Sequence, residues 1–293
     1  MTDSAQRQVV DPLDPRSALH AVEERFRAND LAGARELLQR LLPNVEHDAP
    51  LQSRVLSDLG VLEFADADPE AAGLFAARAL ELNPENAPAL ELLAQLTRER
   101  ELRAEALLAE QQQARIQQYR LMSTCVRVRG EPLRRIPLML HGMGRISFGD
   151  GVVMGWLTAP GFHTDYIYIE AAKPHAHVEI GDRTFFNNGT SLRSFGPGIS
   201  VGSDCLFGWY VDVVDSDMHP MDPAQRRSGE PSHGHVRIGN NVFVGAHSQI
   251  LKGVTIGDDT VIGAGSVVVK SLPAGVIAAG NPARVIRALD DLP

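Results

Sequence analysis

One rhythm dominates the last third of the chain: every sixth residue is a branched aliphatic. The residues in register are Ile238, Val244, Ile250, Ile256, Ile262 and Val268, and four of them are followed directly by glycine. An α-helix would need a period of 3.6 and a simple strand a period of 2, so neither explains the pattern. A six-residue period that pairs a bulky apolar residue with a small one is typical of a solenoid, in which three units make one triangular coil. The spacing therefore predicts a left-handed parallel β-helix.

The same rhythm recurs upstream with interruptions. It is carried by Ile180, Phe186 and Leu192, and then, after Gly196-Pro197-Gly198, by Val201, Phe207 and Val213; Phe148 and Met154 are expected to begin the first coil. Between Val213 and Ile238 the rhythm is lost over a polar stretch. A solenoid accommodates an insertion where a loop can leave at a corner, and such loops commonly serve a binding face. We therefore expect the chemistry in this extended loop.

Residues 16–122 are expected to form a separate helical domain, after a flexible N-terminus over residues 1–15. Residues 18–42 and 55–82 each carry a helical periodicity that is broken once by turn signals, which predicts helix, turn, helix twice. The segments around Ala34 and Ala72 superpose, with small residues where paired helices would pack closely, and this resembles tetratricopeptide repeats. Residues 85–122 are expected to add one or two more helices. Such a module either binds a protein partner or forms a solvated cap without one.

The fold class expected from these patterns is an α + β solenoid. It comprises the helical domain that resembles tetratricopeptide repeats, a connector over residues 123–140, and a left-handed parallel β-helix with an extended loop over residues 141–293. A chain of 293 residues is long enough for two such domains.

Composition narrows the functional classes. The formal net charge of −9 argues against non-specific binding of nucleic acid. No apolar run reaches the length of a membrane span, and no signal-peptide pattern is visible, so membrane insertion is not expected. The two cysteines, Cys125 and Cys205, are expected to be free thiols in a reducing compartment. We accordingly expect a cytoplasmic protein.

The late repeats resemble a known family. The segments that carry the resemblance are Ile238 to His247, Ile250 to Gly257, Val261 to Val268 and the closing Ala279-Gly280-Asn281-Pro282-Ala283-Arg284. Over residues 178–288 the chain is similar to the hexapeptide-repeat acetyltransferases, and most of all to the galactoside and maltose O-acetyltransferases. The resemblance implies acetyl-coenzyme A as donor, a small-molecule sugar as acceptor, a homotrimer, and active sites between adjacent prisms. No metal is expected.

The resemblance assigns the chemistry to the extended loop. The family's catalytic histidine falls on His219, which keeps the following Pro220. A sugar hydroxyl needs a base to take its proton as it attacks a thioester, and imidazole can do so near neutral pH. An Arg-x-x-Gly-Glu pattern at residues 226–230 makes Glu230 the expected carboxylate that orients His219, with Asp215 and Asp217 as alternatives.

The acceptor side is expected around four residues outside the loop. An asparagine of the family falls on Asn187 or Asn188, with a register uncertain by one residue; we expect Asn188 in a catalytic role and Asn187 against the substrate. Trp209, Tyr210 and Asp217 are further expected to contact the acceptor.

Coenzyme A is expected along a groove beside the late coils. Small residues would allow its pantetheine arm to approach the backbone, and cations would meet its phosphates. The expected contacts are Ala246, Gly263, Ala264, Ser266, Lys270, Arg284 and Arg287. Relatives often carry tryptophan where this chain has Phe243.

Several alternatives remain open at this point. The same base and donor would serve an amino-sugar N-acetyltransferase, and a non-catalytic trimeric scaffold would recruit a partner through its helices. Zinc chemistry of the γ-carbonic anhydrase type would need three histidines on adjacent faces, which loop histidines do not supply. The helices are unlike those of serine acetyltransferases. Cys205 lies within a repeat and no Gly-x-Ser-x-Gly motif occurs, which favours direct transfer over an acyl-enzyme. The sequence leaves the acceptor and the length of the acyl group open.

Overall fold

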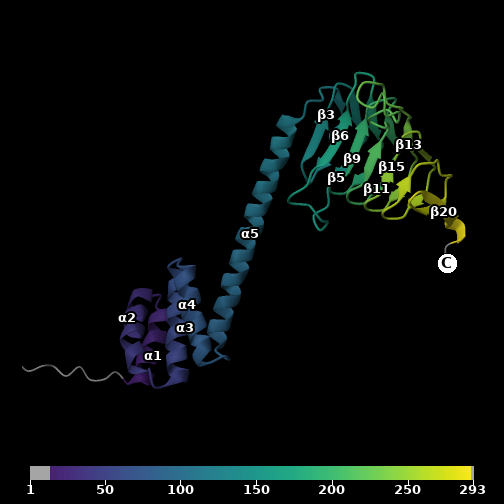
Figure 1. Cartoon of the computed structure of the whole chain (residues 1–293). Coiled ribbons are helices and arrows are strands. Elements are labelled where there is room, and N and C mark those ends of the chain that lie inside the picture. The colour runs from purple at the N-terminus through teal and green to yellow at the C-terminus, as the bar shows by residue number, and fades with distance from the viewer. Residues whose placement is uncertain (1–13, 292–293) are drawn as a thin grey trace, which may run out of the picture. The chain divides into compact units, whose positions relative to one another are not determined.

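A computed structural model describes residues 14–291 of the chain (Figure 1). It divides into two compact units, residues 1–107 and residues 108–293. The first thirteen residues of the expected flexible N-terminus lie outside the described part. Its last residue, Pro15, opens the first helix.

The first unit is built from helices with clear start signals. They are α1 (Pro15–Arg27), α2 (Leu31–Leu41), a short 3-10 turn (Leu42–Asn44), α3 (Ala49–Ala65), α4 (Pro69–Leu82) and the beginning of α5 (Ala87–Met122). An aspartate caps each of the first four helices by accepting a hydrogen bond from a backbone N–H of the first turn; these caps are Asp14, Asp30, Asp48 and Asp68. The expected helix, turn, helix arrangement is thus present twice.

Small residues allow these helices to pack closely. Ala34 and Ala72, which occupy equivalent places in the two sequence segments, are both fully buried. Ala34 belongs to a core with Leu38, Leu41 and Leu59, whereas Ala72 belongs to a second core with other residues of α3, α4 and α5. Each helix pair therefore buries an apolar face against its neighbour.

The second unit is a parallel coil of three sheets. Sheet A has the strand order β1(Val128–Arg129), β4(Arg145–Phe148), β7(His177–Ile180), β10(Ile199–Val201), β13(Val236–Ile238), β16(Thr255–Ile256). Sheet B has the order β2(Leu133–Arg134), β5(Val153–Met154), β8(Phe185–Phe186), β11(Leu206–Phe207), β14(Phe243–Val244), β17(Val261–Ile262), β19(Val276–Gly280), β20(Ala283–Ala288). Sheet C has the order β3(Leu138–His141), β6(Ile167–Ala171), β9(Ser191–Ser194), β12(Asp212–Val214), β15(Gln249–Ile250), β18(Val267–Val268).

Successive strands pass from sheet A to B to C and back to A, which makes one coil for every three strands. In the last coils the register is the expected one, because Ile238 pairs with Ile256 and Val244 with Ile262, eighteen residues later. The final strands β19 and β20 depart from the pattern by pairing antiparallel.

The coil begins earlier than residue 141. The expected connector contains β1, β2 and β3, and these strands pair in parallel with β4, β5 and β6. The connector prediction over residues 123–140 is therefore wrong, because this segment already forms the first coil. The six-residue period is not visible in this segment. Its strands lack the repeated pair of an aliphatic residue followed by a small one.

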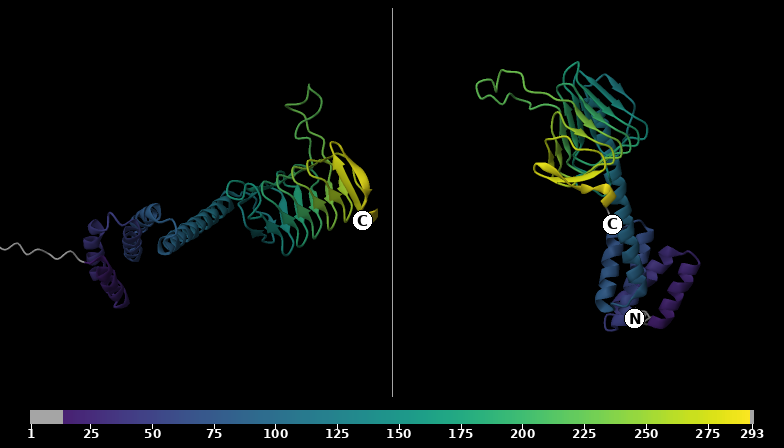
Figure 2. Two further views of the ribbon diagram at one scale, coloured as in Figure 1. Left: turned by 90° about the horizontal axis from the view of Figure 1, so that it is seen from below. Right: turned by 90° about the vertical axis from the view of Figure 1, so that its right-hand side faces the viewer.

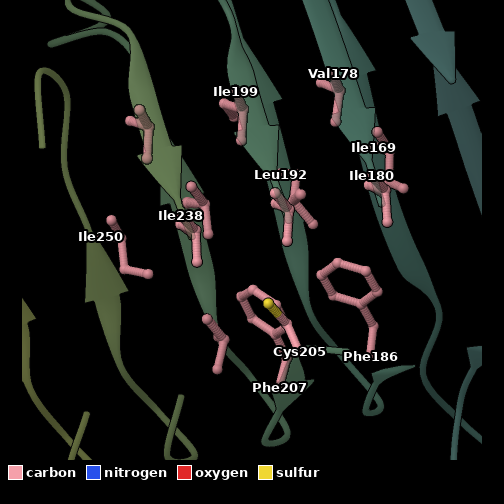
Figure 3. Close-up of a cluster of buried hydrophobic side chains, with 14 of the residues drawn as sticks. Ile169, Val178, Ile180, Phe186, Leu192, Ile199, Cys205, Phe207, Ile238 and Ile250 are labelled. Atoms are coloured by element: carbon pink, nitrogen blue, oxygen red, sulfur yellow. The ribbon is translucent and has the colours of Figure 1, made fainter. Parts of the chain in front are cut away.

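The repeated residues form the core of the coil (Figure 3). All six aliphatic residues of the late rhythm are at most 3% exposed. Phe186 and Phe207 stack on each other in successive coils, with ring centroids 4.4 Å apart. The glycine after a core residue lets the next coil approach: a Cβ on Gly245 would lie 2.5 Å from the Ala264 nitrogen.

The last part of α5 belongs to the coil unit. Gln112 and Ile116 are 5% and 4% exposed, and the Gln112 side chain donates to the carbonyl oxygens of Arg135 and Phe162 at 3.1 and 2.8 Å. Arg115 also binds backbone carbonyls of this unit. The expected boundary at residue 122 is thus about fifteen residues too late, because α5 runs across the boundary between the two units at residue 107 and ends only at Met122. Within residues 14–291, none of the helices is both long and apolar enough to cross a membrane.

This boundary predicts how the chain can be divided. A protein starting at Leu108 keeps Gln112, Arg115 and Ile116, whereas one starting at Val126 leaves their carbonyl partners and an apolar surface exposed. We expect the longer fragment to fold, and the shorter one to lose about 3 kcal/mol or more of unfolding free energy. Urea denaturation followed by circular dichroism measures the difference. Equal stability of the two fragments would contradict the assignment of this helical segment to the coil unit.

Candidate active site

The extended loop is the main departure from the coil rhythm. Residues 215–235 leave the coil between β12 of sheet C and β13 of sheet A, and Figure 2 shows this green segment projecting from the coil. Its two ends are tied together, since the Asp217 nitrogen donates to the Ser232 oxygen at 3.0 Å and the Gly234 nitrogen to the Asp215 oxygen at 2.9 Å. We call this position the C/A edge. The loop is therefore anchored at its base while most of its residues stay exposed.

His219 lies in this loop with its ring exposed. Its Nδ1 lies 3.2 Å from the carbonyl oxygen of Arg226, and its backbone nitrogen donates to the Asp217 oxygen at 2.7 Å. A carbonyl oxygen can only accept, so Nδ1 carries the proton and Nε2 keeps its lone pair. The loop thus presents an imidazole whose Nε2 can take a proton from a substrate.

The structure does not bring Glu230 to His219. The Glu230 carboxylate is highly exposed and pairs with Lys173 at 3.3 Å. Asp217 pairs with Lys252 at 3.0 Å, so its carboxylate is also engaged elsewhere, although its backbone oxygen contacts the His219 nitrogen. The group that contacts His219 Nδ1 is a backbone carbonyl, which a search for carboxylates cannot find.

Asp215 is a buried anchor and contacts neither His219 nor solvent. It is 0% exposed and accepts hydrogen bonds from Ser194 Oγ at 2.8 Å, Phe195 N at 2.7 Å and Gly198 N at 2.9 Å, with a further contact from Gly196 N. The alternative in which Asp215 orients His219 is therefore wrong, because its carboxylate is buried and fully engaged with another corner. Its carboxylate holds the Gly196-Pro197-Gly198 corner against the base of the extended loop.

The two asparagines have different environments. Asn188 is 0% exposed, and its amide bonds the Trp156 nitrogen at 2.9 Å and the carbonyl oxygens of Trp156, Ala159 and Pro160. A catalytic role for Asn188 is therefore contradicted, because its donors and acceptor are all used by a neighbouring loop. Asn187 is half-buried, accepts from the Asn188 nitrogen at 2.8 Å, and shows no partner for its Nδ2 among the described residues. Asn187 is thus the asparagine that can contact a substrate.

Asn187 lies where sheet B turns into sheet C, and we call this position the B/C edge. Trp209 and Tyr210 occupy the same edge one coil later, and His247 follows in the next coil. Trp209 Nε1 donates to His247 Nε2 at 3.2 Å, and the rings of Tyr210 and His247 stack with centroids 5.2 Å apart. The Tyr210 hydroxyl is hydrogen-bonded to Asp165, which raises the pKa of Tyr210. These contacts give the edge a fixed aromatic wall.

Sequence reasoning missed two members of this wall, His247 and Asp165. His247 was visible as the residue after Ala246 in a repeat, but one sequence gives no sign that it stacks on Tyr210. Asp165 comes from residues 155–166, which separate β5 from β6 and keep no repeat. Its approach to Tyr210 depends on a contact between residues 45 positions apart.

The residues expected to hold coenzyme A lie further along the coil. Ala246, Gly263 and Ala264 continue the B/C edge, where Ala264 is exposed. Ser266 is 0% exposed and its hydroxyl bonds within the corner, accepting from Gly280 N at 3.2 Å, so direct contact of Ser266 with a ligand is contradicted. Lys270, Arg284 and Arg287 are exposed, and none of them pairs with a carboxylate in the part of the chain described. Small side chains leave the backbone accessible at this edge, and cations without a carboxylate partner follow. This combination suits a long anionic ligand.

The two sets of site residues lie on different edges of one prism. His219 leaves from the C/A edge, whereas Asn187, Trp209, Tyr210 and Ala264 lie on the B/C edge. Sheet C separates these edges. Its strands β9 and β12, which follow Asn187 and Tyr210, have four and three residues and span roughly 10 Å or more at about 3.3 Å per residue. Within the described residues, no hydrogen bond joins the two sets. One chain therefore holds the two sets of expected site residues apart.

Two other chemistries find little support in this geometry. Cys125 and Cys205 are both buried free thiols, as expected, and burial raises the pKa of Cys205. A thiol with a raised pKa holds little thiolate at neutral pH, so Cys205 is a poor nucleophile. Among residues 14–291, no three histidine, cysteine or acidic side chains are grouped to hold a metal ion.

The chain is similar to known proteins, and for a family model the matching residues lie in the coil. A family described as bacterial transferase hexapeptide (six repeats) matches residues 235–270. The chain is 52% identical over 116 residues to the galactoside O-acetyltransferase of Escherichia coli (strain K12), which covers 40% of this chain. It spans 56% of that relative, or little more than half its length.

Two solved structures are also similar. A galactoside acetyltransferase in complex with coenzyme A shares 28% identity, with 66% of this chain and 82% of that chain covered and a TM-score of 0.41. A hexapeptide-repeat acetyltransferase of Vibrio cholerae O1 biovar eltor, complexed with acetyl coenzyme A, also shares 28% identity, with 49% and 71% covered and a TM-score of 0.41.

The anchor role of Asp215 can be tested by stability. In Asp215→Asn an NH2 group replaces one carboxylate oxygen and faces backbone N–H groups, so we expect a loss of about 3 kcal/mol in unfolding free energy. Asp150→Asn, at an exposed corner, is the matched control and should change stability by less than about 0.5 kcal/mol. Chemical denaturation measures both. An Asp215→Asn protein as stable as this control would refute the anchor role.

Proposed function

We propose that this chain is a member of the hexapeptide-repeat acetyltransferases and acts as an acetyl-coenzyme A-dependent O-acetyltransferase that acetylates a carbohydrate hydroxyl. His219 acts as general base and the acetyl group passes directly to the acceptor. The carrying observation is the His219 imidazole, whose Nδ1 lies 3.2 Å from the Arg226 carbonyl oxygen in the long insertion between Val213 and Ile238.

The loop geometry supports the role of His219. With Nδ1 donating to the Arg226 oxygen, Nε2 is the free acceptor that a general base requires. When Nε2 takes the hydroxyl proton, the positive charge on the ring strengthens the bond from Nδ1 to that carbonyl. The carbonyl thereby performs the orienting task that the sequence assigned to Glu230.

Asn187 is the proposed partner for developing negative charge. Its Oδ1 is fixed by the Asn188 nitrogen, which leaves Nδ2 directed away from that contact and able to donate. Acetyl transfer builds charge on the thioester carbonyl oxygen, and an amide donor there stabilises the transition state. The buried Asn188 supports this by fixing the adjacent backbone.

The donor is proposed to bind along the B/C edge of the late coils. Acetyl-coenzyme A supplies the activated thioester; Ala246, Gly263 and Ala264 leave room for its arm, and Lys270, Arg284 and Arg287 would meet its phosphates. Phe243, 46% exposed on sheet B, offers an apolar surface beside this edge. These features fit a long ligand with an apolar middle and an anionic end.

A homotrimer is proposed to bring the two edges together. Along the outer surface of sheet B, the paired positions form an apolar row: Leu133, Val153, Phe185, Leu206, Phe243, Val261 and Ile277. The matching outer row of sheet A is polar, with Ser147, Glu179, Ser200, Arg237 and Thr255. An apolar row along one face favours contact with another copy, and a cyclic trimer would place the C/A edge of one copy beside the B/C edge of the next.

The finer features of the architecture belong to the same proposal. The coil is taken to be left-handed, and the helical unit to be a module similar to tetratricopeptide repeats that binds a protein partner. The capped helix pairs and the two buried alanines support the latter. The cytoplasmic location stays a prediction.

The base can be tested by substitution. A thiol-release assay with acetyl-coenzyme A and a panel of sugars and amino sugars first identifies the acceptor. His219→Ala should then lower kcat by roughly 10²–10⁴-fold, with little change in the affinity for acetyl-coenzyme A measured by calorimetry, because the donor residues lie on other coils.

Two controls accompany this variant. His175→Ala removes an exposed histidine outside the loop, and Glu230→Gln neutralises the carboxylate that pairs with Lys173. Both should retain wild-type kcat within about threefold. A His219→Ala protein that keeps activity within threefold would reject the base. Turnover on amino sugars alone would reject O-acetylation.

A further inference from the structure

A groove lies on the outer surface of sheet C, beside the aromatic wall of the B/C edge. It has a volume of about 280 Å³ and is lined by Asp165, Tyr166, Tyr168, Ser191 and Tyr210, among others. Tyr166 and Tyr210 are 41% and 38% exposed, so aromatic surface is open to a ligand. None of the roles proposed above uses Asp165, Tyr166 or Tyr168.

One wall of the groove is formed by residues 155–166, and this segment is held from two sides. Near its start, the Asn188 amide binds Trp156, Ala159 and Pro160 through their backbone. Near its end, the Arg115 guanidinium donates to the carbonyl oxygens of His163, Thr164 and Asp165 at 2.6, 2.8 and 3.0 Å.

Helix α5 supplies the second clamp on this segment. Gln112 donates to the Phe162 oxygen at 2.8 Å while its own Oε1 accepts from Arg115 at 2.9 Å. The Tyr119 ring packs against Tyr166 with centroids 5.0 Å apart. A segment without regular structure is thus fixed by directed bonds to its backbone, which is what a binding site requires of a loop.

The clamped segment places Asp165 against Tyr210. The Tyr210 hydroxyl donates to Asp165 Oδ2, and Thr164 Oγ1 donates to Asp165 Oδ1 at 3.2 Å. The Tyr210 ring covers Gly189, where an added Cβ would lie 2.3 Å from a ring carbon and where φ is +69°. The ring position therefore depends on glycine at 189, and the carboxylate and phenol form one rigid pair.

The chemistry of the lining selects a ligand class. Two carboxylate oxygens offer about four acceptor positions, and two are used, so Asp165 can still accept from hydroxyl groups. Tyrosine rings provide flat apolar surfaces that can pack against the face of a sugar ring that presents C–H groups. Two cations lie near the groove, and both are engaged: Arg115 binds three carbonyls and Gln112, and Arg193 pairs with Asp212 at 2.8 Å. A negative carboxylate without an available cation disfavours an anionic ligand.

We infer that this groove is a carbohydrate subsite that seats a neutral sugar ring of an acceptor longer than one residue, with Asp165 and Tyr210 as its hydrogen-bonding groups. Gln112 and Arg115 are positioning residues, because they hold the loop that carries Asp165. The inference rests on the proposed function for its link to an acceptor, since Tyr210 joins the groove to the edge that carries Asn187. The acceptor class that follows is a neutral oligosaccharide.

Binding can be measured without acetyl transfer. The full chain, without acetyl-coenzyme A, is titrated by calorimetry and saturation-transfer NMR with maltotriose, cellotriose and tri-N-acetylchitotriose as neutral probes, and with trigalacturonic acid as the anionic probe. We expect at least one neutral trisaccharide to bind more tightly than the anionic one. Asp165→Ala and Tyr210→Phe should each weaken that binding about tenfold or more, and Asp150→Ala should leave it unchanged.

The positioning role has its own test. Arg115→Lys keeps the charge but loses the fork that binds three carbonyls, so it should weaken trisaccharide binding about as much as Asp165→Ala while the far-UV spectrum stays native. No binding of any neutral probe, tighter binding of the anionic probe, or wild-type binding by Asp165→Ala overturns the inference. These outcomes are independent of acetyl transfer: a chain that acetylates a sugar but fails here keeps the proposed function, and one that binds but never acetylates keeps the subsite.

Discussion

The stacking of one coil on the next is the constraint on which the rest of the molecule depends. Each turn of backbone must pair with the turn before it, place an aliphatic side chain inside, and avoid colliding with the turn after it. The residue pairs Ile238-Gly239 and Val244-Gly245 meet these demands together, since the first residue fills the core and the second lets the following coil approach. Extra residues can then leave only where a strand ends. The two long departures, residues 155–166 and 215–235, are both at such places.

This constraint decides where chemistry can be built. The inward-facing residues of the strands are occupied with core packing, so the exposed side chains lie on the edges and outer faces. One departure supplies His219 on the C/A edge, and the other supplies Asp165 beside Tyr210 on the B/C edge. Buried polar residues keep both in place: Asp215 anchors the first, and Asn188 anchors the second. Both anchors are fully buried, and each holds a loop that carries a residue of the proposed sites.

The sequence predicted the parts of the fold that repeat, and failed where contacts are specific to one place. Six aliphatics in register are enough to predict the late coils, because spacing alone places them in the core. The first coil was missed because its strands lack the repeated pair of an aliphatic and a small residue. The end of α5 was assigned to the wrong unit because its helical pattern continues without a break. The same limit applies to the site. The break in rhythm predicts the loop, and the family resemblance selects His219 within it. The choice between Asn187 and Asn188 depends on which side chain faces inward, and the partner of His219 is a backbone carbonyl that no residue type reveals.

The central claim is that the site is completed by a second copy, which brings His219 of one chain to Asn187 of another. Co-expression of His219→Ala and Asn187→Ala chains tests this most directly, because each variant alone lacks one half of every site. If the copies assemble at random, about one quarter of the sites in the mixed protein combine two intact halves, and acetyl transfer should recover to about one quarter of the wild-type rate. Mixed assemblies, verified by two affinity tags, that stay as inactive as the separate variants would contradict a site shared between copies.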